Sequence, residues 1–111
     1  MSLDVFCPAD GVCTVALAVA TSSQAVALID PKTGNDDRYY RVAVTGSDPA
    51  IIAFGKSGIA VTAPANGAPA NGITIPAGGV EIFRRDCATT HLAALCRSGS
   101  TEVEVTTGRG V

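Results

Sequence analysis

Four cysteines and one histidine carry the most reactive side chains of this sequence. Cys7 and Cys13 lie near the start, and Cys87 and Cys96 flank His91 near the end. A thiol beside an imidazole can act as a nucleophile or in a redox couple. The residues around His91, however, match no nucleophile elbow and no cysteine-hydrolase motif. We therefore expect His91 to be a half-exposed strand residue, and an enzyme or redox protein using Cys87, Cys96 and His91 is an alternative.

The cysteine spacing also bears on metal binding and disulfides. Structural zinc sites use cysteine pairs separated by roughly two to four residues, and no such pair occurs here. A disulfide between the two ends of the chain is geometrically possible. The apolar run 14–20 imitates the core of a secretory signal, but Asp4 and Asp10 precede it and no Lys or Arg does, unlike a secretory signal. We expect a strand there, and reduced, buried thiols that pack as small apolar groups.

Acidic residues form two groups that could bind cations or transfer protons. Asp30 and residues 35–37 lack the ligand spacing of an EF-hand loop, and no bidentate Glu follows them. We predict a solvated turn, with weak adventitious cation binding as the alternative. Glu102 and Glu104 share one strand face, which we expect to be solvated. With no phosphate-binding glycine motif either, we predict a protein that is not an enzyme and uses no metal or cofactor.

Composition limits the class of protein further. The chain has 111 residues, enough for one domain, with 47% hydrophobic and 16% charged residues. This is too apolar and too weakly charged for a disordered chain. The net charge is -2 and no basic stripe occurs, so we expect no nucleic-acid partner. No run approaches the roughly 18 apolar residues of a membrane span, so we expect no membrane partner.

Alternating or continuous apolar runs between clusters of turn-forming residues predict short β-strands. The strands are expected at 12–20, 24–29, 38–45, 50–55, 59–63, 80–85, 91–97 and 102–106. The first two are separated by Thr21-Ser22-Ser23 and are expected to form a hairpin. The run 50–55 is nearly all apolar, as in a strand covered on both faces. The run 91–97 could be a short helix, but its link through 98–100 to the alternating run 102–106 favours a strand.

About eight short strands without an amphipathic helix predict an all-β fold, an antiparallel β-sandwich of jelly-roll type. The many alanines suit two closely packed sheets. We expect residues 12–111 to form this single domain and residues 1–11, with Pro8, to form an extended N-terminal arm that orders on a neighbouring molecule. Edge strands of such sandwiches are often buried against another copy.

The segment 63–72 spells APANG twice and lies within residues 57–80, which carry no charge. Its two Asn-Gly pairs predict turns in a protruding loop. One interpretation is a surface excursion without function; the other is a contact arm against a neighbouring subunit, because charge depletion marks interface cores. The candidate partner-contact residues are Pro64, Asn66, Gly67, Pro69, Asn71, Gly72 and Pro8.

From residue 41 onward the order of segments resembles small structural proteins of tailed bacteriophages. The segments are RVAVTGSDPA, IIAFGKSGIAV, IPAGGVEIFRR, THLAALCRSGS and EVEVTTGRGV. They include the P-x-G-x-x-E block after an apolar loop and the terminal T-x-G-x-G-V that recur in that class. The match covers about the last two thirds of the chain.

This resemblance implies a β-sandwich component of the virion and carries over no catalytic residue. It implies a capsid decoration (cement) protein, made in the host cytoplasm, that binds the major capsid protein and itself, as a trimer at threefold positions, on the capsid surface. A head-to-tail joining or tail protein is the alternative within virions. A small ligand- or carbohydrate-binding jelly-roll module is the alternative from another class, although the sequence has no Trp to stack on sugars.

Overall fold

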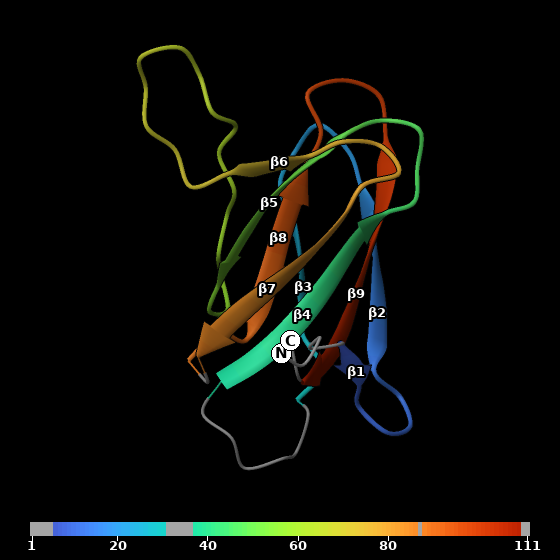
Figure 1. Cartoon of the computed structure of the whole chain (residues 1–111). Coiled ribbons are helices and arrows are strands. Elements are labelled where there is room, and N and C mark those ends of the chain that lie inside the picture. The colour runs from blue at the N-terminus through green and yellow to red at the C-terminus, as the bar shows by residue number, and fades with distance from the viewer. Residues whose placement is uncertain (1–5, 31–36, 87, 110–111) are drawn as a thin grey trace, which may run out of the picture.

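The structure is a computed structural model that describes residues 6–30, 37–86 and 88–109. Nine strands are found in these ranges (Figure 1). Their bounds are β1 Cys7–Pro8, β2 Thr14–Val19, β3 Gln24–Ala27, β4 Asp37–Val44, β5 Ala50–Gly55, β6 Ile73–Ile75, β7 Val80–Asp86, β8 His91–Leu95 and β9 Thr101–Arg109. Within the same ranges, no helix has the length and apolar character needed to cross a membrane.

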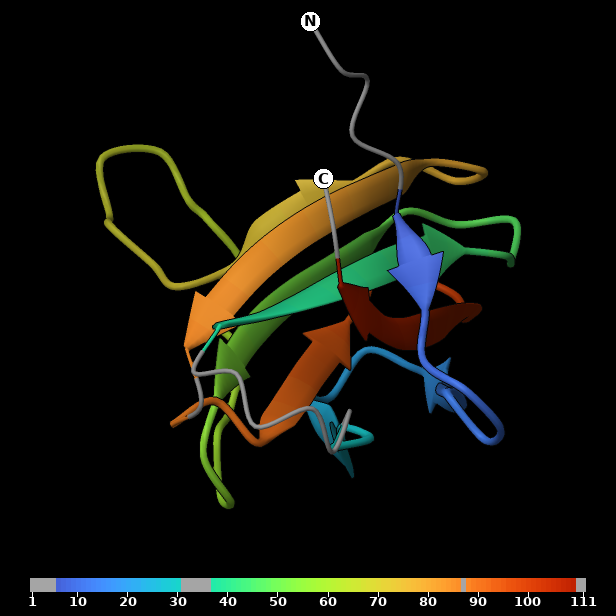
Figure 2. The same ribbon diagram turned by 60° about the horizontal axis from the view of Figure 1, so that its bottom comes forward.

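The strands form two antiparallel sheets that face each other (Figure 2). In the first sheet, β9 pairs with β4 on one side and with β1 and β2 on the other, and β7 pairs with the far side of β4. The second sheet has the order β3-β8-β5-β6. From β2 to β9 this is the arrangement of a jelly roll, in which two Greek keys fold onto each other. The predicted all-β, antiparallel sandwich is confirmed.

The core lies between the sheets and follows from the alternation of apolar residues. Val103 and Val105 of β9 are buried and lie opposite Val44 and Val42 of β4. Successive side chains of a strand point to opposite faces, so Glu102 is left on the exposed face, as predicted. The few large rings of the core cluster together, since the ring centroids of Phe54 lie 5.8 Å from Tyr40 and 5.1 Å from Phe83.

The predicted hairpin of 12–20 and 24–29 is wrong, although both strands exist. β2 pairs with β9 of the first sheet, and β3 pairs with β8 of the second. The chain crosses between the sheets at residues 20–23, where the carbonyl of Ala20 accepts a hydrogen bond from the Cys96 amide (2.9 Å). This crossing lets the apolar residues of both strands face one core from opposite sides.

The strand β5 is covered on both faces, as its continuous apolar run predicts. Ile52 faces the core between the sheets, whereas Ile51 faces a second, smaller cluster on the outer face with Val61. The predicted strand at 59–63 is wrong, because this segment covers the second sheet from outside and joins no ladder. Two of its amides bond to side chains instead: Val61 N donates to Ser23 Oγ (3.1 Å), and Thr62 N donates to Asn71 Oδ1 (2.8 Å).

The remaining predicted strands are present with shifted ends. The segment 91–97 is a strand at His91–Leu95 and not a helix, and the last strand extends to Arg109. The chain also has short strands that the sequence pattern did not indicate, at Ile73–Ile75 and at Cys7–Pro8. The second of these pairs with β9 of its own chain.

Candidate functional site

Among the described residues, the reactive side chains of Cys7, Cys13, His91 and Cys96 are not assembled into a reactive site. His91 lies half-buried in β8, where its Nδ1 is 2.8 Å from Thr90 Oγ1. Cys96 is buried, and its thiol donates to the carbonyl of Gly99 at 3.3 Å. The thiol and the imidazole therefore engage different partners. Cys87 lies outside the described residues. Cys7 and Cys13 are free, but Cys7 is exposed and Cys13 is half-buried, so the expectation of buried thiols is correct only for Cys96 among the described cysteines.

The acidic groups likewise form no ligand set in the part of the chain that the structure describes. No cluster of three or more His, Cys, Asp or Glu side chains that could hold a metal occurs there. The predicted solvated turn around residues 35 and 36 lies outside the described residues, while Asp30 lies 3.5 Å from Arg38 in an ion pair. Glu102 accepts a hydrogen bond from the Thr45 hydroxyl at 3.1 Å, which ties it to the neighbouring strand.

One buried side chain has a shifted pKa. Burial of Tyr40 raises the pKa of its hydroxyl, and the nearby Arg38 guanidinium partly offsets this rise by attraction and by a hydrogen bond. Tyr40 is 1% exposed and packs within the core. It therefore stabilises the sandwich in its neutral form and is not placed to exchange protons with a ligand.

The segment 60–72, which we call the arm, stands out from the sandwich as a loop (Figure 1, yellow-green). Asn71 closes its base with two hydrogen bonds. Its Oδ1 accepts from Thr62 N (2.8 Å), and its Nδ2 donates to Ala60 O (2.9 Å). An Asn side chain that bonds two backbone groups in this way replaces the ladder that the loop does not have. The two segments of chain at the base of the arm are therefore held together by a residue of the arm itself, Asn71.

Further contacts hold the arm to the second sheet. Arg97 Nη2 donates to Pro64 O at 2.7 Å, which joins the arm to the turn after β8. Gly72 packs so closely that a Cβ atom there would collide with Ile51 and with the Thr62 carbonyl. Glycine is needed where two pieces of backbone approach this closely. A small hollow of about 280 Å³, lined in part by Arg97 and Ile51, lies beside this junction.

The tip of the arm is a tight turn. Ala68 N donates to Ala65 O at 3.0 Å, and Gly67 takes a φ of 74°, a value that favours glycine. The first Asn-Gly pair thus forms a turn, as predicted, whereas the second Asn-Gly pair, Asn71-Gly72, fixes the base. From residue 65 to residue 71 every side chain is exposed and uncharged.

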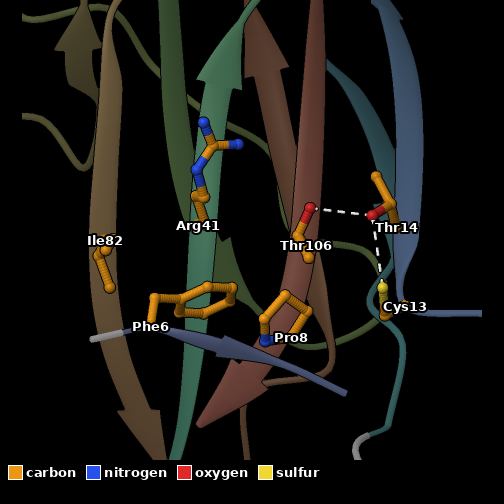
Figure 3. A pocket seen from close by; sticks show the side chains of 7 residues that line it. All are labelled: Phe6, Pro8, Cys13, Thr14, Arg41, Ile82 and Thr106. Carbon is orange, nitrogen blue, oxygen red and sulfur yellow. Dashed lines mark hydrogen bonds between the residues drawn. The ribbon is translucent and has the colours of Figure 1, made fainter. Parts of the chain in front are cut away.

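Pro8 is not close to the arm. It lines a hollow on the outer face of the first sheet (Figure 3), whereas the arm packs on the outer face of the second sheet. The chain beside Pro8 lies along β9, where Ala9 N donates to Thr107 O (3.0 Å). The seven residues that line this hollow are Phe6, Pro8, Cys13, Thr14, Arg41, Ile82 and Thr106. The candidate contact residues therefore belong to two surfaces on opposite sides of the sandwich.

The strand β7 was not among the sequence candidates, although its Ile82 also lines the hollow beside Pro8. Every residue of β7 except Phe83 is exposed, including Val80 at 45% and Ile82 at 41%. The alternation in VEIFRR placed these two residues on one face but could not tell that this is the outer face of the first sheet. Two exposed apolar side chains on an edge strand are a feature that only the topology reveals.

Comparison with known proteins supports the fold alone. No family model matches the chain, and no curated protein matches it. A crystal structure of PirA is similar, with a TM-score of 0.55 and 13% sequence identity over 88% of this chain and 95% of that chain. A structure of Bacillus endospore appendages, described as a novel family of disulfide-linked pili, has a TM-score of 0.43 and 18% identity over 95% of this chain and 96% of that one. At these identities, the likeness to PirA shows that the chain has the fold of a β-sandwich and shows no function.

Proposed function

We propose that this protein is a non-enzymatic structural component of a virion: a decoration protein that binds the outer surface of the capsid and holds neighbouring capsid subunits together. The fastened, uncharged arm is the observation that carries this proposal. Its partners are the major capsid protein and further copies of the same chain. The order of sequence segments that resembles phage structural proteins supports the virion as its location.

The arm is suited to form a contact because hydrogen bonds fix its conformation before it meets a partner. Binding normally costs the free energy of ordering each side chain and loop at the interface. Here Asn71 and Arg97 already hold the base of the arm, and a turn closes its tip. The alanine and proline side chains of the arm have little rotamer freedom left to lose. Contact through the arm therefore loses little conformational entropy.

The charge distribution favours protein as the surface that the arm contacts. Interface cores are depleted of charge, whereas solvated loops normally carry it. Residues 57–80 contain no charged side chain, and most of the arm is exposed. Many modest contacts of this kind, repeated over a lattice, stabilise a shell through multivalency.

Shortening the arm tests the proposal with little disturbance of the sandwich. Deleting residues 64–68 removes one of the two APANG copies and leaves a single APANG, in which Asn71 and Gly72 keep their places. We expect the variant to fold but to bind capsids that lack this protein at least about tenfold more weakly, because the loss of one well-packed contact costs about 1.4 kcal/mol or more. Unchanged capsid binding would refute the role of the arm.

Matched charge substitutions separate contact from folding. Ala68→Glu places a carboxylate on the exposed arm, and Ala77→Glu places the same charge on an exposed loop between β6 and β7. We expect only Ala68→Glu to weaken capsid binding, since burying an unpaired charge in an interface is costly. Equal effects of both variants would indicate general repulsion and contradict a specific contact.

A further inference from the structure

The outer edge of β7 is the longest open strand edge of the described chain. β7 pairs with β4 on one side, and no described strand pairs with its other side. Figure 2 shows β7, in orange, as the outermost strand of its sheet. Its seven residues run without a proline or a bulge in the register with β4. Natural proteins usually shorten, bend or cover such an edge because it can pair with another chain.

The backbone groups of β7 alternate between the two sides of the strand. Val44 of β4 donates its N–H to Gly79 O, and the next residue, Thr45, donates to Glu102 O of β9. The direction of these groups alternates along a strand, so Val44, Val42 and Tyr40 point toward β7. Their register partners on β7 point back to β4, and the residues between them, Val80, Ile82 and Arg84, direct their backbone groups to the outer edge.

We propose that this edge pairs with the same edge of a second copy, antiparallel and centred on Phe83, so that the first sheets of two molecules join into one. A two-fold contact of this type is self-complementary: where one residue of the first copy lies opposite a given residue of the second, the same pair recurs with the two copies exchanged. With Phe83 opposite Phe83 of the second copy, Ile82 lies opposite Arg84. Both of these residues direct their backbone groups to the shared edge, as an antiparallel hydrogen-bonded pair requires.

Charge complementarity selects this register. Centring on Phe83 places Glu81 opposite Arg85 of the second copy, and Arg85 opposite Glu81, so that two opposite-charge pairs form across the edge. Moving the centre to Ile82 places Glu81 opposite Phe83, and moving it to Arg84 places two Arg84 side chains opposite each other. Opposite charges across a strand pair stabilise it, and like charges destabilise it. Of these three registers, only the one centred on Phe83 places opposite charges across the edge.

Charged residues on an edge strand are also a common device against pairing. On β7 they accompany exposed apolar side chains, since Val80 and Ile82 are 45% and 41% exposed. Ile73 of β6, at the edge of the second sheet that leads into β7, is exposed as well. A second copy paired with this edge would cover part of this apolar surface. Charged residues that only protect the edge from pairing would leave the apolar surface exposed.

This inference deepens the proposed function, since it names the surface through which copies of a structural subunit meet. A two-fold contact does not by itself build the trimer that the phage resemblance implies. Contacts of different symmetry can coexist in one lattice when they use different surfaces. The β7 edge and the arm are such separate surfaces, because β7 belongs to the first sheet and the arm packs on the second.

Complementary charge reversals test the register on the purified full chain. Glu81→Arg and Arg85→Glu each place two like-charge pairs across the edge of a homodimer. Mixing the two variants in equal amounts restores opposite charges in the heterodimer, and the double variant restores them in a homodimer. Lys56→Glu, on an exposed turn after β5, changes the net charge by the same amount as Arg85→Glu and is the control for that change. Sedimentation velocity at low salt measures the association in each case.

We expect the wild type to form a dimer and each single reversal to raise the dimer dissociation constant at least about tenfold. The mixture and the double variant should both regain dimers. A wild-type chain that stays monomeric at millimolar concentration would overturn the inference, as would dimers that tolerate the reversals or fail to recover on mixing. Failure to recover on mixing would be expected if β7 paired with another edge, such as that of β3. The two proposals fail separately: a β7 dimer whose arm binds no capsid contradicts only the function, and a monomer whose arm binds capsids contradicts only the pairing.

Discussion

Asn71→Ala is expected to release the base of the arm while the sandwich stays folded. The substitution removes two hydrogen bonds, from Thr62 N at 2.8 Å and to Ala60 O at 2.9 Å. A typical intramolecular hydrogen bond contributes about 0.5–1.5 kcal/mol net. Because Asn71 is exposed and water can replace part of each bond, we take the lower half of the summed range, about 1–2 kcal/mol.

This loss should appear as local opening, which native-state amide exchange measures directly. The Thr62 amide donates to Asn71, so its exchange should rise by about 5- to 30-fold at about 1.4 kcal/mol per tenfold change. The Val61 amide provides an internal control, because it donates to Ser23 Oγ at 3.1 Å and not to Asn71. Its exchange should change less than that of Thr62.

Asn66→Ala is the matched control variant, since Asn66 lies at the exposed tip of the arm and outside the base. We expect it to leave Thr62 exchange unchanged. Equal Thr62 exchange in wild type and Asn71→Ala would refute the claim that Asn71 fastens the arm. A loss of protection throughout the sheets would instead mean that the arm and the sandwich unfold as one unit.

Three further predictions concern the sandwich. The Thr107 hydroxyl is buried without a hydrogen-bond partner among the described residues, so Thr107→Val should raise the free energy of unfolding in urea by about 1 kcal/mol. Thr106→Val, which breaks the bond to Thr14 Oγ1 (2.9 Å), should give no such gain. Gly72→Ala should lower the same quantity by about 1–3 kcal/mol through its collisions, whereas the exposed Ala70→Ser should stay within about 0.5 kcal/mol. Burial raises the pKa of Tyr40, so the contribution of Tyr40 to the free energy of unfolding is complete below about pH 10 and declines above it by up to about 1.4 kcal/mol per pH unit. The difference in the free energy of unfolding between wild type and Tyr40→Phe should therefore narrow above about pH 10. A difference that stays constant with pH would contradict this explanation.

The sequence predicts which residues face a core better than it predicts which strands pair. Alternation correctly placed Val103 and Val105 inside, and the continuous run of β5 correctly indicated cover on both faces. The same alternation is compatible with any partner strand, so the expected hairpin of β2 and β3 failed. Pairing depends on contacts far apart in the chain, such as Ala18 of β2 beside Glu102 of β9, and no local pattern records them.

The candidate site shows the same division. The Asn-Gly pairs predicted turns in a protruding loop; the loop is present, but only Asn66-Gly67 forms a turn, whereas Asn71 fixes the base. Its fastening was not predictable, because Asn71 reaches 11 residues back to Ala60 and Arg97 reaches 33 residues back to Pro64. The segment 59–63 has the apolar spacing of a strand, yet it packs over the second sheet from outside. The open edge of β7 follows only from the order of the strands.

The copy number of this chain in purified virions tests the central proposal most directly. Quantitative mass spectrometry can measure it against the major capsid protein of the same particles. A decoration protein is expected at a copy number on the order of hundreds, close to that of the capsid subunit, because it repeats with the lattice. About a dozen copies or fewer would indicate a ring at the portal or tail and contradict decoration, and absence from the particle would contradict a structural role in the virion.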